Sequence, residues 1–335
     1  MCKRILVSQT NTEDGVPFYK IGTIGSTPDA YISKELFDDY KVKYNYPRKG
    51  EVMINCAGTV GKCVVYDGED AYFQDSNIVW IDNPTQYISN GFLFHLLSKV
   101  DWRKLNSTTI IRIYNDDLRN LKMSYPRKEE QQKISHLLSL LDERIATQNK
   151  IIDKLQSLIK GIAQNIVSNN KPNIRLSDCL DCSSSTLQES DVCETGIYPV
   201  YGANGIVGYL DNYNTEGEAV YIIKDGSGVG TVSYATGKCS ATGTLNTLQA
   251  KDGYSLQYLY YILKVFNFEP YKTGMAIPHI YFKDYGKAKI FCPSYTEQLR
   301  YARLQSAIDS KLSVEKNILT SLSSQKQYLL RQMFI

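Results

Sequence analysis

Two glycine-rich turns carry the residues of this sequence whose types and spacing could do chemistry. The first, Gly58-Thr-Val-Gly61-Lys62, follows the apolar run Glu51–Asn55, and the second, Asp225–Thr231 (DGSGVGT), follows Glu218–Ile223. Glycine permits a positive φ and the close approach of another backbone or of a phosphate. Each turn could therefore be a nucleotide-binding loop, a plain hairpin turn, or a turn whose backbone N–H groups contact a DNA phosphate.

Side chains suited to such contacts lie in and around the two turns. The turn residues that would meet a phosphate are Gly58, Thr59, Gly61 and Lys62 in the first half, and Ser227, Gly228 and Thr231 in the second. Polar residues able to bond base edges follow, namely Gln74, Ser76 and Asn77, and then Thr242, Thr244 and Asn246. Asn246 is the expected counterpart of Asn77, and the two asparagines could instead bond the backbone of a turn.

Basic residues surround both turns. They are Lys41, Lys43, Arg48, Lys49 and Lys62 in the first half, and Lys272, His279, Lys283, Lys287 and Lys289 in the second. These side chains either position DNA phosphates or form a solvated charged face.

No pattern of a known catalytic or metal site stands beside these residues. The first turn has only two residues between its glycines, and Cys63 after the lysine, so it does not fit a nucleotide phosphate loop. An Asn/Asp-Pro-Pro-aromatic motif for base methylation is missing, since Asn83-Pro84-Thr85 lacks the second proline. Three histidines offer few candidates for a triad, and Cys179-x-x-Cys182 lacks the second pair of a zinc ribbon. We expect no catalytic and no metal-binding residues.

Composition adds only broad limits. With 38 Lys and Arg against 35 Asp and Glu, the net charge of +3 neither favours nor excludes nucleic acid as a partner. No apolar run approaches 18 residues, so no membrane association is expected, and the sequence opens without a secretory leader. We expect a cytoplasmic protein whose eight cysteines are reduced.

Two long amphipathic segments must position the two turns. In residues 126–168, apolar residues recur at alternating steps of four and three, with one polar interruption at Gln148. The apolar positions are Ile134, Leu138, Leu141, Ile145, Ile152, Leu155, Ile159, Ile162 and Ile166. This heptad seam predicts a helix about 60 Å long, which is too long for one wall of an ordinary core. We call this segment and its C-terminal copy the rods.

The chain is an internal duplication with a period of half its length. Adding 167 to a residue number in the first rod gives its counterpart in the second, residues 294–334. The register conserves Pro126 as Pro293, Asp142 as Asp309, and the polar interruption Gln148 as Glu315. Such a repeat predicts two rods that pack antiparallel, related by a pseudo-twofold axis, with the polar pair at the midpoint.

The segments outside the rods have the short apolar runs and Gly, Asp and Asn breaks of mostly-β domains. Each also contains one expected helix, residues 88–98 and 256–265, and a returning strand is expected in residues 108–123. We therefore predict an α+β protein with four parts: a first domain at residues 1–125, N-terminally short, a spacer helix at 126–170, a second domain at 171–292 and a distal helix at 293–335.

This arrangement resembles the specificity (S) subunit of type I restriction–modification enzymes. The resemblance rests on a Gly-Glu strand start (Gly50-Glu51), the Gly-x-x-Gly-Lys turn, and the strand Gln74–Trp80 with its asparagine. An aromatic helix and a Pro-x-x-x-Glu-Gln start of a long heptad helix follow, and this order occurs in both halves. The second rod departs from it after Glu297-Gln298, where Leu-Arg-Tyr-Ala-Arg replaces the usual x-x-Ile-Ala.

The resemblance implies a non-catalytic subunit that recognises a bipartite double-stranded DNA target, with one target recognition domain for each half-site. It implies as partners two methyltransferase subunits and restriction (helicase–nuclease) subunits, joined by two antiparallel coiled-coil helices. No cofactor would bind to this chain, because S-adenosylmethionine, ATP and Mg²⁺ would belong to the partner subunits. Two other function classes fit the residues alone: a protein-interaction scaffold with duplicated lobes on a coiled coil, and an autonomous enzyme with an unrecognised site.

Overall fold

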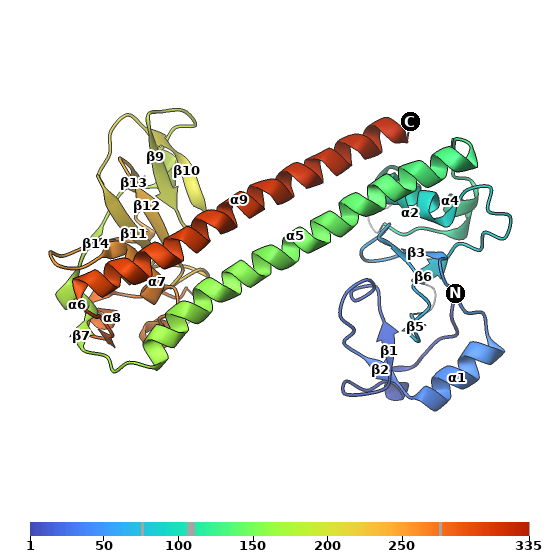
Figure 1. Cartoon of the computed structure of the whole chain (residues 1–335), viewed down its shortest axis with the longest axis horizontal. Coiled ribbons are helices and arrows are strands. Elements are labelled where there is room, and N and C mark those ends of the chain that lie inside the picture. Colours follow the sequence, from blue (N-terminus) through green and yellow to red (C-terminus); the bar gives the residue numbers. More distant parts are fainter. Residues whose placement is uncertain (75–76, 106–110, 275–276, 335) are drawn as a thin grey trace. The chain divides into compact units, whose positions relative to one another are not determined.

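The structure is a computed structural model that describes residues 1–74, 77–105, 111–274 and 277–334 (Figure 1). It divides into two compact units. Unit 1 consists of Met1–Thr147 and Leu319–Ile335, and unit 2 consists of Gln148–Ile318. Each unit therefore contains one globular half together with part of each rod.

The two rods are helices α5 (Lys128–Ser168) and α9 (Tyr295–Met333), as the heptad pattern predicts. Acidic residues occupy the first turn of each, at Glu129 and Glu130 in α5 and at Glu297 in α9, where the helix dipole favours negative charge. Every residue of the predicted α5 seam is buried or half-buried. The long helices thus owe their stability to an apolar stripe along one side.

Hydrogen bonds between the rods show that they run antiparallel. In unit 2, the Gln148 Nε2 donates to the Glu315 carbonyl oxygen at 3.0 Å and to the Glu315 carboxylate. Also in unit 2, the Gln305 Nε2 donates to the Ile159 carbonyl at 3.3 Å. From Gln148 to Ile159 the residue numbers on α5 increase, while those of their bonded partners on α9 decrease from Glu315 to Gln305. The two helices therefore run in opposite directions. Gln148 and Glu315 are counterparts in the repeat, so their contact is what a pseudo-twofold repeat requires at its centre.

Glu315 is held as a carboxylate at this polar contact. The Lys311 ammonium, 2.5 Å from the carboxylate, and the bond from Gln148 both lower the pKa of Glu315 below its usual range. Polar residues at a helix seam specify register more than they add stability. The predicted meeting of the two polar interruptions is therefore confirmed.

The globular half of unit 1 contains two small three-stranded sheets. One has the order β2-β1-β5, with β1 antiparallel to β2 and parallel to β5, and the other has the antiparallel order β4-β3-β6. The strands are β1 (Val16–Tyr19), β2 (Tyr31–Ile32), β3 (Val52–Asn55), β4 (Cys63–Val65), β5 (Tyr72–Phe73) and β6 (Ile78–Trp80). The helices are α1 (Lys34–Lys43), α2 (Asn90–Lys99), α3 (Trp102–Leu105) and α4 (Asn115–Arg119), preceded by the 3-10 turn η1 (Val7–Gln9).

The globular half of unit 2 repeats this topology with additions. Order β10-β9-β13 matches β2-β1-β5 in every strand direction, and β12-β11-β14 matches β4-β3-β6, with β8 added at its edge. The strands are β7 (Ile174–Arg175), β8 (Leu180–Ser184), β9 (Tyr198–Gly202), β10 (Gly205–Leu210), β11 (Glu218–Ile223), β12 (Val232–Thr236), β13 (Ser240–Ala241), β14 (Leu245–Ala250) and β15 (Lys289–Ile290). The shorter helices are α6 (Leu176–Cys179), η2 (Glu189–Asp191), α7 (Leu256–Leu263), η3 (Glu269–Tyr271) and α8 (Phe282–Tyr285).

The expected returning strand at residues 108–123 is wrong for the part that the structure describes. Residues 111–123 contain α4 and no strand. The matching strand in unit 2, β15, exists because β7 pairs with it. The first half offers no such partner among its described residues, so this segment coils instead into a short helix whose first turn is acidic, with Asp116 and Asp117.

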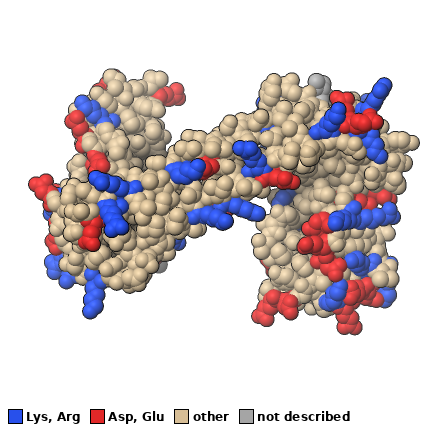
Figure 2. All heavy atoms as spheres, in the orientation of Figure 1, with Lys and Arg blue, Asp and Glu red and all other residues tan. Residues whose placement is uncertain are grey.

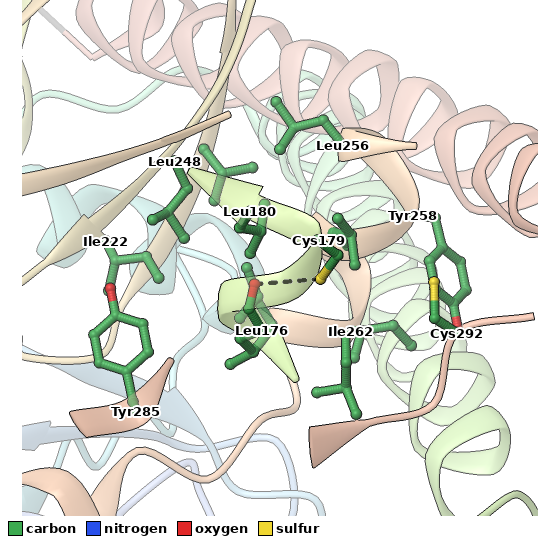
Figure 3. Close-up of a cluster of buried hydrophobic side chains, with 14 of the residues drawn as sticks. Leu176, Cys179, Leu180, Ile222, Leu248, Leu256, Tyr258, Ile262, Tyr285 and Cys292 are labelled. Atoms are coloured by element: carbon green, nitrogen blue, oxygen red, sulfur yellow. Dashed lines mark hydrogen bonds between the residues drawn. The ribbon is translucent and has the colours of Figure 1, made fainter. Parts of the chain in front are cut away.

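The core of unit 2 joins the β11 sheet to α7 and the small helices (Figure 3). Leu176, Ile222, Leu248 and Tyr258 are fully buried there. Cys179 lies in the same cluster, and its thiol donates to the Leu176 carbonyl at 3.4 Å, the contact drawn in Figure 3. Burial raises the pKa of Cys179 to about 12, so this thiol is a small core side chain.

The glutamine of the Pro-x-x-x-Glu-Gln pattern ties each rod to its neighbouring helix. In unit 1, the Gln131 side chain accepts from the Ser89 N–H at 2.7 Å and donates to the Tyr87 and Pro126 carbonyls, each at 2.9 Å. In unit 2, Gln298 accepts from the Ser255 N–H and donates to the Pro293 carbonyl, both at 2.9 Å. Ser89 and Ser255 are the N-cap residues of α2 and α7, so one buried amide fixes the start of each helix.

Candidate nucleic-acid interface

The first glycine-rich turn is a tight connection between β3 and β4. The Gly61 N–H donates to the Asn55 carbonyl at 2.9 Å, and the Lys62 N–H donates to the Thr59 carbonyl at 3.2 Å. Both glycines have positive φ, 67° at Gly58 and 83° at Gly61. A Cβ on Gly61 would stand 2.2 Å from the Trp102 ring, so the turn requires glycine for conformation and for space.

The second turn is built in the same way between β11 and β12. The Gly230 N–H donates to the Ile223 carbonyl at 2.9 Å, and the Thr231 N–H donates to the Gly228 carbonyl at 3.0 Å. A Cβ on Gly230 would stand 3.0 Å from Phe268, which takes the place of Trp102. Both turns are therefore hairpin connections, and Gly61 and Lys62 correspond to Gly230 and Thr231.

The polar residues after β5 and β13 lie directly beside the turns. The Cys56 N–H donates to the Asn77 carbonyl at 2.7 Å, and the matching Lys224 N–H donates to the Thr244 carbonyl at 3.0 Å. Asn77 is half-buried and Thr244 is half-buried, so both are partly open to solvent. Ser76 lies outside the described residues.

Asn246 is not the counterpart of Asn77, which corrects the alignment expected from residue type. Ile222 faces Asn246 across the sheet, whereas the matching pair in the first half is Ile54 and Val79. The buried Asn246 side chain accepts from the Ser184 hydroxyl at 2.9 Å and donates to the Tyr285 hydroxyl at 3.1 Å. These bonds give Asn246 a structural role, but its partners are two side-chain hydroxyls and not the turn backbone that the sequence analysis considered.

Gln74 and Thr242 are also counterparts, and both form hydrogen bonds that hold the segments beside the turns in place. Each donates its N–H to the strand beside it, Gln74 to the Tyr19 carbonyl at 2.9 Å and Thr242 to the Tyr201 carbonyl at 2.9 Å. The Gln74 side chain accepts from the Ile21 N–H at 3.2 Å, and the buried Thr242 hydroxyl bonds Thr244 at 2.8 Å. Thr59 joins the same network, since its hydroxyl donates to the Ile21 carbonyl at 3.0 Å.

Three of the basic candidates lie outside the two turns. Lys43 is at the end of α1, 2.5 Å from the Asp39 carboxylate, and Lys49 precedes β3 at the end opposite Gly58. Lys287 follows α8. Figure 2 shows that positive and negative side chains are interleaved on this face of the units, without a single basic patch.

The structure also brings to the turns two arginines and an aromatic residue that the sequence analysis did not select. Arg103 and Trp102 open α3 beside the first turn. Arg112 precedes Ile113, whose N–H donates to the Cys56 carbonyl at 2.9 Å, just as the Ile280 N–H after His279 donates to the Lys224 carbonyl at 2.9 Å. Arg112 plus 167 is His279, so the repeat itself could have identified it.

Burial makes the thiols near the first turn poor nucleophiles. It raises the pKa of Cys63 to about 12 and that of Cys56 to about 11, although the charge of Arg112 lowers the Cys56 value. Within the described ranges, no three His, Cys, Asp or Glu side chains gather as metal ligands. Nor does any helix there combine the length and apolar composition needed to span a membrane.

Comparison with known families decides the affiliation of the chain. Residues 1–157 and 172–324 both match the family described as "Type I restriction modification DNA specificity domain". The chain belongs to this family. The two matches correspond to the two halves of the repeat, so the specificity domain occurs here twice.

Named relatives agree with this affiliation. A putative type I restriction enzyme specificity subunit of Haemophilus influenzae is 48% identical over 160 residues, which cover 48% of this chain and 41% of the relative. A putative type I specificity subunit of Mycoplasma pneumoniae is 25% identical over 85% of this chain and 83% of its own length. The crystal structure of a type I restriction–modification S subunit from M. genitalium superposes with a TM-score of 0.69, covering 100% of this chain and 92% of that one at 19% identity. This last similarity shows a shared fold.

Proposed function

We propose that this chain is the DNA-recognition subunit of a type I restriction–modification complex, and that each globular half recognises one part of a bipartite target. The observation that supports this most directly is the duplicated turn. Each half places a glycine hairpin, an exposed Lys62 or Thr231, and a partly exposed polar residue, Asn77 or Thr244, at the same end of its central strand. Two similar but chemically different surfaces suit two different half-sites.

Within this proposal, the chain itself carries out no reaction. Its buried thiols are protonated at neutral pH, which is consistent with a binding role. Base modification and DNA cleavage would come from two methyltransferase subunits and from restriction subunits. S-adenosylmethionine, ATP and Mg²⁺ would then bind to those subunits.

The first test is selection of bound sequences from a random duplex pool, using the chain together with its methyltransferase subunits. We expect enrichment of two fixed half-sites separated by a spacer of unspecified sequence. Replacing residues 196–290 with the same segment of another family member should change only one half-site. Enrichment of a single continuous site, or of none, would contradict the proposal and favour a protein-interaction scaffold.

The rods carry a second apolar stripe that supports methyltransferase docking. Leu137, Ile151 and Leu158 on α5 recur at heptad spacing and are 41%, 37% and 49% exposed. Leu304 and Ile318 on α9 are the counterparts of Leu137 and Ile151 and are 52% and 37% exposed. Exposed apolar residues at helical spacing are typical of helix-docking surfaces. Because two of the three stripe positions are duplicated, the rods offer one equivalent site per half.

We therefore expect the methyltransferase stoichiometry to fall stepwise. Leu304→Glu should reduce the ratio from two methyltransferases per chain to one, and Leu137→Glu combined with Leu304→Glu should reduce it to none. Placing a carboxylate in an apolar interface costs at least ~2 kcal/mol, or roughly 30-fold in affinity. The ratio can be measured by light scattering of the assembled complex. Ser139→Glu is the matched control, since it adds the same charge at an exposed position of α5; equal losses for this variant would contradict the assignment.

A further inference from the structure

A hollow of about 580 Å³ lies between the first glycine turn and α3 in unit 1. Its lining includes Gly58, Gly61, Lys62, Asp101, Trp102 and Arg103. The Lys62 and Arg103 side chains are exposed, and neither forms an ion pair within the part of the chain that the structure describes. The hollow is therefore polar, and two cationic residues line it.

Among the described lining residues, the single carboxylate, that of Asp101, is engaged by its neighbours. Asp101 accepts from the Arg103 N–H at 3.3 Å and lies 3.5 Å from the Lys104 ammonium. These contacts offset its charge, so the hollow favours an anion. The Lys62 side chain passes close to Gly25, and its flexible stem can turn the ammonium toward a ligand.

Trp102 adds a donor that the described residues leave unused. Its side chain is 5% exposed, and the buried Nε1 has no hydrogen-bond partner in the described part of the structure. A Cβ on Gly61 would stand 2.7 Å from this nitrogen, so glycine keeps the indole edge clear of a side chain. Buried N–H groups are normally bonded, and an unbonded one beside a cationic hollow points to an acceptor ligand.

The corresponding place in unit 2 has the opposite chemistry. The Asn267 side chain accepts from the Glu269 N–H at 3.0 Å, as Asp101 does from the Arg103 N–H. This shared bond makes Phe268 and Glu269 the counterparts of Trp102 and Arg103 in the repeat. Thr231 stands where the first turn has Lys62. The second turn thus has no cation at either position, no indole N–H, and a carboxylate that Lys272 holds at 2.5 Å.

We propose that the hollow at Gly58–Lys62 binds a phosphodiester of the DNA backbone through Lys62, Arg103 and the Trp102 indole, and that the matching place in unit 2 does not. The two halves then contribute unequally: the first supplies an ionic anchor, and the second contacts DNA there without one. This inference rests on the proposed DNA-recognition function. Backbone N–H groups in a glycine turn together with flanking cations are a general means of holding phosphate.

The test measures the salt dependence of binding to a labelled mixed-sequence duplex of about 30 base pairs by fluorescence anisotropy. The full chain is used with its methyltransferase subunits. Lys62→Gln and Arg103→Gln should each reduce the slope of log affinity against log salt by about one, so that each variant loses roughly three- to fourfold less affinity than the wild type between 50 and 200 mM salt. Both residues are exposed, so neither change threatens folding.

Two control variants separate this hollow from general electrostatics. Arg119→Gln removes an exposed arginine of the same unit, one that lies 3.7 Å from Asp116, and Thr231→Ala changes the counterpart of Lys62. Both should keep the wild-type slope. If the wild type binds DNA and the slope is unchanged in Lys62→Gln and Arg103→Gln, the hollow does not bind a phosphodiester. The proposed DNA-recognition function would still stand. Failure of the wild-type complex to bind any duplex would overturn both.

A second readout observes the hollow directly. The chain has two tryptophans, Trp80 and Trp102, so two indole N–H signals are expected in a ¹⁵N-edited spectrum, and Trp102→Phe assigns them. Duplex DNA should shift the Trp102 signal and leave that of Trp80 in place. A Trp102 signal that moved with millimolar inorganic phosphate but not with saturating duplex would show that the hollow holds only a free anion, contrary to the proposal.

Discussion

Replacing Gln131 with leucine is expected to destabilise unit 1 by roughly 3–5 kcal/mol. Gln131 is 1% exposed and satisfies one N–H and two carbonyls. Leucine has similar size but leaves these three groups unpaired away from water, each at a cost of about 1–3 kcal/mol. Gln298→Leu should cost less in unit 2, since the structure shows two bonds for that side chain.

The effect should be local as well as large. Hydrogen exchange measured by mass spectrometry should show faster exchange at the start of α2 in Gln131→Leu, and at the start of α7 in Gln298→Leu. Gln132→Leu, at an exposed position of the same helix, is the control and should leave both helices unchanged. Unaltered protection of α2 in Gln131→Leu would mean that Gln131 does not hold Ser89 as described.

The hydrogen bonds of these glutamines could not be predicted from the sequence, although the rods that contain them could. The heptad seam predicted both rods, their bounds within two residues, and the contact of Gln148 with Glu315, because a period of seven over forty residues allows little else. Gln131 and Gln298 appeared only as letters of a family pattern. Glutamine is usually exposed, and nothing in its neighbours indicates that it will bond the start of another helix.

The sequence predicted the two glycine turns of the candidate site, but it matched some residues of the two halves incorrectly. The strand before each glycine turn was expected, and the structure confirms β3 and β11. Matching asparagine to asparagine paired Asn77 with Asn246, whereas the period of 167 pairs it with Thr244. Relying on residue type over register also hid Arg112, the counterpart of His279. Surface residues of the two halves have diverged, so position in the repeat is a better guide there than identity.

Trp102 and Arg103 could not have been selected from the sequence for a different reason. They lie about forty residues after the turn that they face, and only the packing of α3 brings them to Gly61. Contacts of this kind depend on tertiary structure and leave no periodic signal. The unequal chemistry of Trp102 and Phe268 becomes visible only when the two glycine turns are compared in structure.

The length of the rods is the second property expected to have a large effect. Because α5 and α9 are antiparallel and in register at Gln148 and Glu315, a change in one helix alone would break their pairing. An equal change in both helices preserves their pairing. One heptad inserted after Thr147 and another after Val314 preserve the apolar seam, and each lengthens its helix by about 10 Å.

If each half recognises its own half-site, these insertions should lengthen the preferred spacer by about three base pairs, since B-DNA rises 3.4 Å per base pair. The bases of both half-sites should stay the same. Selection from a random pool with the methyltransferase subunits measures both properties at once, and a variant carrying the heptad only in α5 is the control for disrupted pairing. The spacer should change because the rods, and not the glycine turns, set the separation of the half-sites. An unchanged spacer in a folded double-insertion variant would assign the rods to methyltransferase docking alone, and altered half-site bases would show that the rods also orient the recognition surfaces.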